Sequence, residues 1–333
     1  MVMRSINTIL QTVKLHFMPK FKIRHVTKYI YETPVRDSAN QIILYPLKDE
    51  YQDVMQHQIK VTGGVAIEIH IDYFGNEVGT FTHAQPHKDL SIDSRLVVVT
   101  RAKKLPADET PAGKQWEDLM RLKNQPQFID FLQQEYFAGV VEAHDVINLV
   151  REKKVTPLAS ATDLCSFVFE NFIYKKGITT VESTLDEIWK IKTGVCQDFA
   201  QVLLAMLRLM DIPARYVSGY ICPNKNGMRG EGATHAWVEA HIPFYGWLGI
   251  DPTNNCIVND NHVRLAVGRN FSDCSPVKGT YRGTSEHTME VSVSVSYEDG
   301  HMAEDSNEVI EHEPINSISR NSYRRHQEIQ MQQ

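Results

Sequence analysis

The chain has 333 residues, 42% of them hydrophobic and 23% charged, a composition typical of a folded globular protein with enough apolar material for a core. Its net charge of −6 and isoelectric point near 6.2 give no indication of a nucleic-acid or anionic-membrane partner. No apolar run approaches the roughly 20 residues of a membrane-spanning helix, and the basic N-terminal segment lacks the cleavage site of a signal peptide. We therefore expect a cytoplasmic protein that binds neither nucleic acid nor membrane.

The cysteines give no sign of a disulfide framework or a structural metal site. They are odd in number and irregularly spaced, without a CxxC pair or the Cys and His ligands of a zinc site. This usage is typical of a reducing compartment, which agrees with the expected location. The five residues are Cys165, Cys196, Cys222, Cys256 and Cys274.

Residues 21–105 are predicted to form a small all-β domain. Its segments are rich in β-branched and aromatic residues or alternate with period two, and Pro, Gly and Asn mark the turns between them. Many short strands with turns between them favour a sandwich or barrel-like arrangement. The predicted strands are "FKIRHVTKYIYETPV", "QIILYPL", "QHQIKVTG", "AIEIHIDYFGN" and "SRLVVVT".

A proline-containing linker, "LPADETPAGKQ", precedes a change to helical periodicity. The next helix begins at Cys196, carries an apolar stripe from Phe199 to Met210, and ends before Pro213, which disfavours helical geometry in the residue before it. The helices predicted ahead of it are "WEDLMRLKNQPQFIDFLQQEYF", "EAHDVINLVREKK" and "ASATDLCSFVFENFIY".

Short strands follow that helix and predict an antiparallel meander. They are separated by Gly, Pro and Asn turns, and "MEVSVSVSY" is the last clear strand of the chain. We assign residues 112–297 to a second domain of α+β class, and residues 298–333 to a polar tail that buries little apolar surface and is expected to be disordered. The meander strands are "ARYVSGYIC", "THAWVEAHI" and "WLGIDPT".

Cys196 stands at the first residue of its predicted helix rather than on the apolar stripe. A helix N-terminus has unpaired N–H groups and a partial positive charge, which favour a thiolate, lower the pKa of a thiol and can stabilise a developing oxyanion. Gly194 is expected to let the chain turn sharply ahead of the helix. The pattern predicts a nucleophile, and the alternative is a small buried residue at a helix start.

His235 and Asp251 are candidates for a general base and its orienting carboxylate. His235, Trp237 and Glu239 share one face of an alternating strand, and His235 follows a glycine-bearing loop. Asp251 ends an apolar strand 16 residues later, about the length of a hairpin return, so it can lie beside His235. Taken alone, either residue could equally be structural, as a satisfied core histidine and an Asp-Pro turn.

Four segments in order strongly resemble the transglutaminase-like superfamily: "TGVCQDFA", "IPARYVSGY", "THAWVEA" and "DPTNN". The β-rich segment is similar to the N-terminal domain of bacterial members, and "VRLAVGRNFSDCSPVKGTYRG" resembles the segment after their catalytic Asp, so the resemblance covers roughly residues 21–297. It implies a papain-like fold, in which a nucleophile helix packs on an antiparallel sheet. It also implies Cys196 as nucleophile, His235 as base and Asp251 as orienting carboxylate. Asn270, where relatives more often have Asp, lies outside this triad.

The resemblance implies acyl transfer through a thioester, without a metal or an organic cofactor. We expect hydrolysis of a peptide or protein amide, as in a cysteine protease or amidase. The alternatives are a protein-glutamine gamma-glutamyltransferase or deamidase with the same triad, and a non-catalytic peptide-binding module. Among neighbouring residues, we expect Asp198 to be structural, Arg215 to pack or pair on the following strand, and Trp237 to line the cleft or the core.

Overall fold

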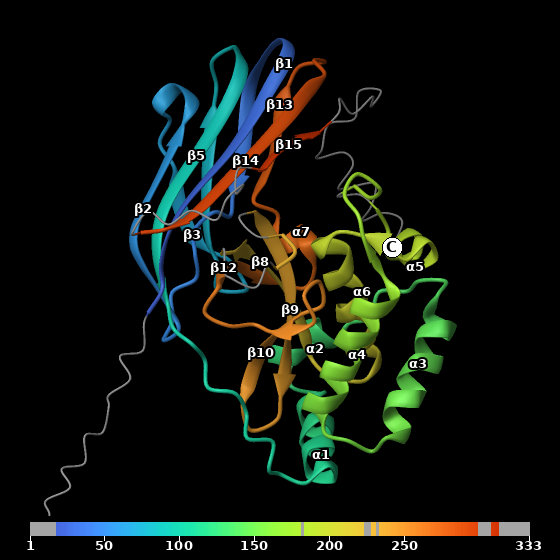
Figure 1. Ribbon diagram of the computed structural model, residues 1–333. Coiled ribbons are helices and arrows are strands. Elements are labelled where there is room, and N and C mark those ends of the chain that lie inside the picture. Colours follow the sequence, from blue (N-terminus) through green and yellow to red (C-terminus); the bar gives the residue numbers. More distant parts are fainter. Residues whose placement is uncertain (1–17, 181–182, 223–227, 231–232, 299–307, 313–333) are drawn as a thin grey trace, which may run out of the picture.

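The computed structural model describes residues 18–180, 183–222, 228–230, 233–298 and, for the backbone, 308–312. Figure 1 shows a β-rich part formed largely by the N-terminal strands, a second antiparallel sheet in the middle, and helices that cover the far side of that second sheet. The α+β class and the preceding β-domain predicted from the sequence are confirmed. Within the described residues, no helix is both long and apolar enough to cross a membrane.

The long strand β1 (Lys20–Ile42) organises the N-terminal β-domain. Its register shifts between Ile30 and Val35 and again between Arg36 and Ala39, where the strand changes partners. Such irregularities bend a strand, so one strand can serve two layers of a sandwich. Before the shifts, β1 pairs with β5 (His87–Thr100) and β14 (His287–Tyr297). After them, it pairs with β4 (Glu77–His83) and β13 (Val277–Arg282). Two further strands extend the sheet, since β2 (Gln52–Val61) pairs with β5 and β3 (Glu68–Ile71) pairs with β4.

Two strands of the predicted second domain belong to this N-terminal sheet. β13 and β14 pair with β1, and the alternating Val293 and Val295 of β14 are buried in the same core as Phe21 and Ile23. The predicted boundary at residue 297 therefore does not follow sheet membership, because alternation shows that a segment is a strand but not which strand it joins. In the tail predicted to be disordered, β15 (Glu308–His312) pairs with β14, and the remainder after Glu298 lies outside the described residues.

All the helices except α7 precede the second sheet in the chain. The predicted segment from Trp116 to Phe137 is divided in two because Pro126 takes the first helical position of α2, where its missing N–H costs nothing. Similarly, α4 begins with Pro157 behind a Thr156 cap, and α5, which was not predicted, begins with a Thr184–Glu187 capping box. The helices are α1 (Ala112–Leu122), α2 (Pro126–Leu132), α3 (Val140–Glu152), α4 (Pro157–Asn171), α5 (Leu185–Ile191), α6 (Cys196–Leu209) and α7 (Phe271–Cys274).

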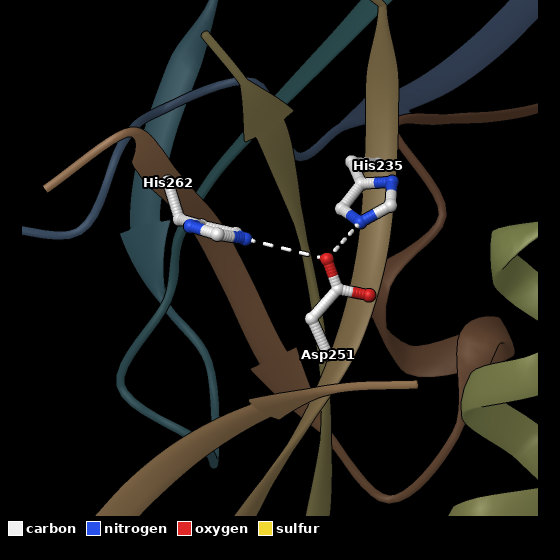
Figure 2. A group of neighbouring side chains, drawn as sticks. All are labelled: His235, Asp251 and His262. Carbon is white, nitrogen blue, oxygen red and sulfur yellow. Dashed lines mark hydrogen bonds and ion pairs between the residues drawn. The ribbon is translucent and has the colours of Figure 1, made fainter. Parts of the chain in front are cut away.

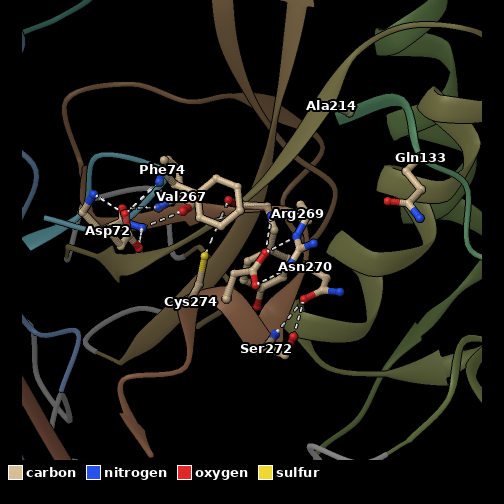
Figure 3. Close-up of polar contacts among 12 residues, drawn as sticks. Asp72, Phe74, Gln133, Ala214, Val267, Arg269, Asn270, Ser272 and Cys274 are labelled. Carbon is tan, nitrogen blue, oxygen red and sulfur yellow. Dashed lines mark hydrogen bonds and ion pairs between the residues drawn. The ribbon is translucent and has the colours of Figure 1, made fainter. Parts of the chain in front are cut away.

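Helix α6 is the centre of the second domain. The sequence predicts one apolar stripe, but the helix is buried on nearly every side, since α3, α4 and α5 pack on it opposite the sheet. Its one buried cation, Arg208, donates to the carbonyl oxygens of Gln133, Ala214 and Arg269, residues labelled in Figure 3. Burial lowers the pKa of Arg208 to about 10, and these carbonyls supply the hydrogen bonds that a buried guanidinium requires.

The second sheet confirms the predicted meander. Its strand order is β11-β10-β9-β8-β12, all antiparallel. One face of β9 contributes Ala236, Val238 and Ala240 to the core around α6, while Trp237, on the other face, packs near Leu47 and Phe74 of the N-terminal segment. The strands are β8 (Ala214–Ile221), β9 (Thr234–Ile242), β10 (Gly246–Asp251), β11 (Cys256–Ile257) and β12 (His262–Gly268).

Candidate active site

Cys196 is the first residue of α6, as predicted. The helix start is held by Asp198, whose Oδ2 accepts hydrogen bonds from the Val195 amide at 2.7 Å and the Thr179 hydroxyl at 2.6 Å. A Cβ on Gly194 would lie 2.4 Å from that oxygen, so glycine is needed for space. Burial raises the pKa of Asp198, and the two hydrogen bonds oppose that shift. These contacts give Asp198 a structural role in presenting Cys196 at the helix tip.

His235 and Asp251 meet across the β9–β10 hairpin. Gly249 pairs with Glu239 and Ile250 with Val238, and continuing this register places Asp251 diagonally opposite His235. Their side chains are fully buried, and His235 Nε2 lies 2.8 Å from Asp251 Oδ2 (Figure 2). The predicted proximity is confirmed by this geometry.

The Asp251 carboxylate is surrounded by hydrogen-bond donors. Oδ1 accepts from the Thr253 amide at 2.9 Å, and Oδ2 accepts from the Asn254 side chain at 2.8 Å as well as from His235. A second imidazole, that of His262, reaches the same oxygen at 3.4 Å (Figure 2). Burial alone would raise the pKa of Asp251, but the charge and hydrogen bond of His235, followed by those of His262, hold it far below its usual range.

His235 is the group whose charge the site stabilises most clearly. Burial disfavours the imidazolium, yet the charge and hydrogen bond of Asp251, then the interaction with Cys196, raise the pKa of His235 well above its ordinary value. Nδ1, which points away from Asp251, makes no hydrogen bond of ordinary geometry within the described residues. Cys196 contributes to the raised pKa of His235, although no hydrogen bond of ordinary geometry joins the two side chains.

Two tyrosines interact electrostatically with Cys196, and an arginine lies beside Asn254, a hydrogen-bond donor to Asp251. The pKa of Tyr174 and that of Tyr216 are raised, first by burial and then by the charge of Cys196. Tyr174 ends β6 (Ile173–Tyr174), which runs parallel to β7 (Thr193–Gly194) just before the helix. Arg229 is bonded through its backbone to the Asn254 side chain, and its guanidinium lies over the Phe169 ring at 4.6 Å. The site therefore has phenol and guanidinium groups at its edge.

The other cysteines lack this setting. Burial raises the pKa of every one of these thiols, and that of Cys256 is raised to about 12. Protonated thiols are poor nucleophiles at neutral pH, so only Cys196 combines a helix tip with an adjacent imidazole. The four are Cys165, Cys222, Cys256 and Cys274.

A metal ion is the other species that the buried cluster could hold. His235, Asp251 and His262 offer one ligand atom each within 4.8 Å of one another. The cluster is already accounted for as hydrogen bonds, because both histidine Nε2 atoms and the Asn254 amide converge on the same carboxylate oxygen. A metal would have to displace these donors.

Sequence reasoning missed His262 and left Trp237 undecided. His262 immediately precedes the segment that resembles the family, at the start of an alternating apolar strand, which is the only signal the sequence offers. Trp237 is fully buried and packs edge-on against the His262 ring, at a centroid distance of 5.2 Å, so it belongs to the core. Arg215 pairs with Glu239 at 2.6 Å, the expected ion pair.

Asn270 stands where relatives more often have Asp, and its side chain has a structural role. Its side chain accepts a hydrogen bond from the Ser272 amide at 3.0 Å and caps α7, as Figure 3 shows. Asn and Asp are comparable helix caps, so the substitution preserves the turn.

Two family models match the chain, one over the N-terminal β-domain and one over the second domain. Residues 145–252 match the model of the Transglutaminase-like superfamily, and residues 21–99 match the Bacterial transglutaminase-like N-terminal region. An uncharacterised protein of Mycobacterium leprae is 30% identical over 283 residues, which is 84% of this chain and 99% of the relative. A protein-glutamine gamma-glutamyltransferase of Pseudomonas aeruginosa is 32% identical over 123 residues, 34% of this chain and 18% of that protein.

A solved structure has the same fold. It is the crystal structure of a candidate cysteine protease from Cytophaga hutchinsonii, which superimposes with a TM-score of 0.65 over 89% of this chain and 98% of that chain, at 19% sequence identity. This likeness extends over both the β-domain and the helical domain.

Proposed function

The chain belongs to the transglutaminase-like superfamily, and we propose that it catalyses acyl transfer from amide bonds through a Cys196–His235–Asp251 triad. The net reaction proposed is hydrolysis of a peptide or protein substrate, the reaction of a cysteine protease or amidase. The observation that carries the proposal is the buried His235 ring, whose Nε2 lies 2.8 Å from Asp251 Oδ2 and whose raised pKa depends also on Cys196, the first residue of α6.

In the proposed mechanism each residue of the triad has its own task. The Cys196 thiolate attacks the amide carbonyl carbon, and the α6 N-terminus offers backbone N–H groups to the oxyanion. His235 then delivers its Nδ1 proton to the leaving amine as the C–N bond breaks, which leaves a thioester on Cys196. Water attacks the thioester while His235 accepts a proton, and the acid leaves as the thiol is restored. Asp251 keeps the imidazole in one orientation and stabilises its cationic form.

The first test needs no substrate. The rate of iodoacetamide labelling at Cys196 is measured against pH by mass spectrometry in the full chain, with Cys196→Ser and His235→Ala as controls. We expect selective labelling of Cys196 at acidic to neutral pH, lost in His235→Ala, because the imidazolium stabilises the thiolate. Slow, uniform labelling of several cysteines would refute the triad and favour a peptide-binding module without turnover.

A second candidate shares the triad and differs only in the acceptor. The likeness to a protein-glutamine gamma-glutamyltransferase over 123 residues favours it. If an amine rather than water resolves the thioester, the product is a cross-linked or amine-modified glutamine. Incubating the chain with glutamine-containing proteins, with and without a tagged primary amine, separates the outcomes: incorporation of the amine indicates transamidation, and cleaved or deamidated product in both samples indicates hydrolysis.

A further inference from the structure

We propose that His262 is a positioning residue for Asp251, and that the N-terminal β-domain holds His262 in place. This inference rests on the proposed function, because it assigns a role to the surroundings of the same triad. It also gives the β-domain a task that neither its sequence nor its fold reveals.

His262 reaches Asp251 from β12, the strand at one edge of the second sheet, whereas Asp251 ends β10, which lies near the other edge. His262 opens β12, pairs with Ile221 of β8, and stretches its ring to the carboxylate oxygen that also binds His235 (Figure 2). The ring is fully buried and is held edge-on against Trp237. Its place is therefore fixed by packing as well as by the hydrogen bond.

The neighbours of His262 determine which nitrogen carries its hydrogen. An ionised carboxylate only accepts, so Nε2 must donate to Asp251 Oδ2. Nδ1 lies 3.4 Å from the Asn259 backbone N–H, which donates to it, and 3.2 Å from Asn259 Oδ1, the oxygen that accepts from the Asn261 backbone amide at 2.9 Å. Burial lowers the pKa of His262, Asp251 opposes this, and the charge of His235 lowers it further. The lowered pKa favours a neutral His262 that donates through Nε2, and the raised pKa of His235 favours the positive charge there.

The turn that carries His262 is bonded to the β-domain on both sides. Before it, the Thr100 hydroxyl of β5 donates to the Asp260 carbonyl at 2.5 Å. After it, Gln52 of β2 accepts from the Arg264 amide and donates to the Arg264 carbonyl, both at 2.8 Å. Thr100 and Gln52 are each 2% exposed, so these bonds are protected from water. A continuous series of contacts links the β-domain to Asp251 through His262.

Charged groups around His262 come from several strands. Asp251 and His235 face its Nε2 side. A pocket between the two domains is lined by His262 together with Arg101, Lys103, Glu239 and Arg264, and within it Arg264 pairs with Glu239 at 3.3 Å. The pocket side therefore holds both cationic and anionic groups, and Asp251 is the anion that His262 contacts.

The test measures Cys196 labelling by iodoacetamide across pH in His262→Leu, His262→Gln, Thr100→Val and Gln52→Leu. In His262→Leu we expect the acidic limb of the profile to move to higher pH and the rate at about pH 6 to fall about tenfold, because Asp251 loses a donor. The high-pH rate should not change, because a free thiolate reacts there without the imidazolium. His262→Gln, which keeps an N–H donor, should restore most of the rate, and the two β-domain variants should lose about threefold.

The matched control is Tyr220→Phe, which also deletes a hydroxyl from an interdomain hydrogen bond, to His25, but leaves the Asn259–Arg264 turn untouched. It should label like the wild type. A folded His262→Leu with the wild-type profile overturns the proposal. If that variant does not fold, wild-type profiles in Thr100→Val and Gln52→Leu overturn it. If the wild type itself lacks His235-dependent labelling, the proposed function fails instead.

Discussion

His25 on β1 and His235 on β9 are buried to nearly the same degree, 1% and 3% exposed, and each ring has one hydrogen bond shorter than 3 Å. The partner of His25 is the Tyr220 hydroxyl at 2.9 Å, and that of His235 is the Asp251 carboxylate at 2.8 Å. Burial lowers the pKa of His25 to about 4, whereas the pKa of His235 is raised despite burial.

The difference shows that one neighbouring charge decides whether the pKa of a buried histidine is lowered or raised. A hydroxyl satisfies a ring nitrogen without favouring either protonation state strongly, so desolvation prevails at His25. A carboxylate with its own set of donors outweighs desolvation at His235. The first histidine joins two domains as a neutral group, and the second holds a charge where the proposed chemistry needs it.

The largest expected effect comes from removing that charge. Asp251→Asn keeps the shape of the site but leaves His235 in an environment like that of His25, so its pKa should fall below the ordinary value. We expect iodoacetamide labelling of Cys196 at about pH 6 to fall at least about 100-fold. Breaking a buried pair should also cost about 3–5 kcal/mol of unfolding free energy, measured by urea titration near pH 6. Retention of wild-type labelling would mean that Asp251 does not govern His235.

The sign of the pH dependence provides a control for this variant. The pKa of His235 is higher in the folded protein than in the unfolded chain. The protonated ring therefore stabilises the folded state fully below about pH 6.5, and this stabilisation is lost as the pH rises towards the pKa in the folded protein. The pKa of the Asp251 carboxyl is lowered by folding, so this group stabilises the folded state at pH values above its ordinary pKa of 3.8. That stabilisation is lost on further acidification. Asp251→Asn should therefore flatten the decline of stability on the alkaline side.

The second prediction concerns His25 and has the opposite sign. Its folded pKa lies below the unfolded value of 6.5, so the unfolded chain binds the proton more tightly and stability falls between about pH 6.5 and pH 4. The loss from this one residue should reach about 3 kcal/mol at pH 4. Urea unfolding of the wild type and His25→Gln at pH 7 and pH 4 measures it. Equal acid sensitivity in the two proteins would contradict the assignment to His25.

The smallest expected effect separates the hydrogen bond of His25 from its burial. Tyr220→Phe removes the hydroxyl, which should lower the unfolding free energy at pH 7 by about 1 kcal/mol. The acid sensitivity should remain, because burial is its cause. If the acid sensitivity disappears with the hydroxyl, the hydrogen bond rather than desolvation controls the protonation of His25.

Local sequence signals were sufficient to predict many of the strands and helices. Period-two alternation identified β8, β9 and β10, Pro213 marked the end of α6, and Cys196 was recognised at its helix tip. These features depend on residues close in the chain, where propensity and periodicity act directly.

The same signals failed where partners are distant in sequence. They assigned β13 and β14 to the second domain, although both strands pair with β1, and predicted one apolar stripe on α6, which is buried on nearly all sides. They explained Gly194 as a sharp turn, whereas the structure shows that the Asp198 carboxylate occupies the space of a Cβ.

The sequence by itself therefore determined most of the strands and helices and the candidates for nucleophilic and acid–base chemistry. Only the tertiary structure decided that His262 joins His235 on one oxygen of Asp251, and that Gln52 and Thr100 hold the turn behind it. Periodicity follows from the local geometry of the chain. The protonation state of a buried imidazole depends on charges brought to it by strands tens or hundreds of residues away, and no local pattern records them.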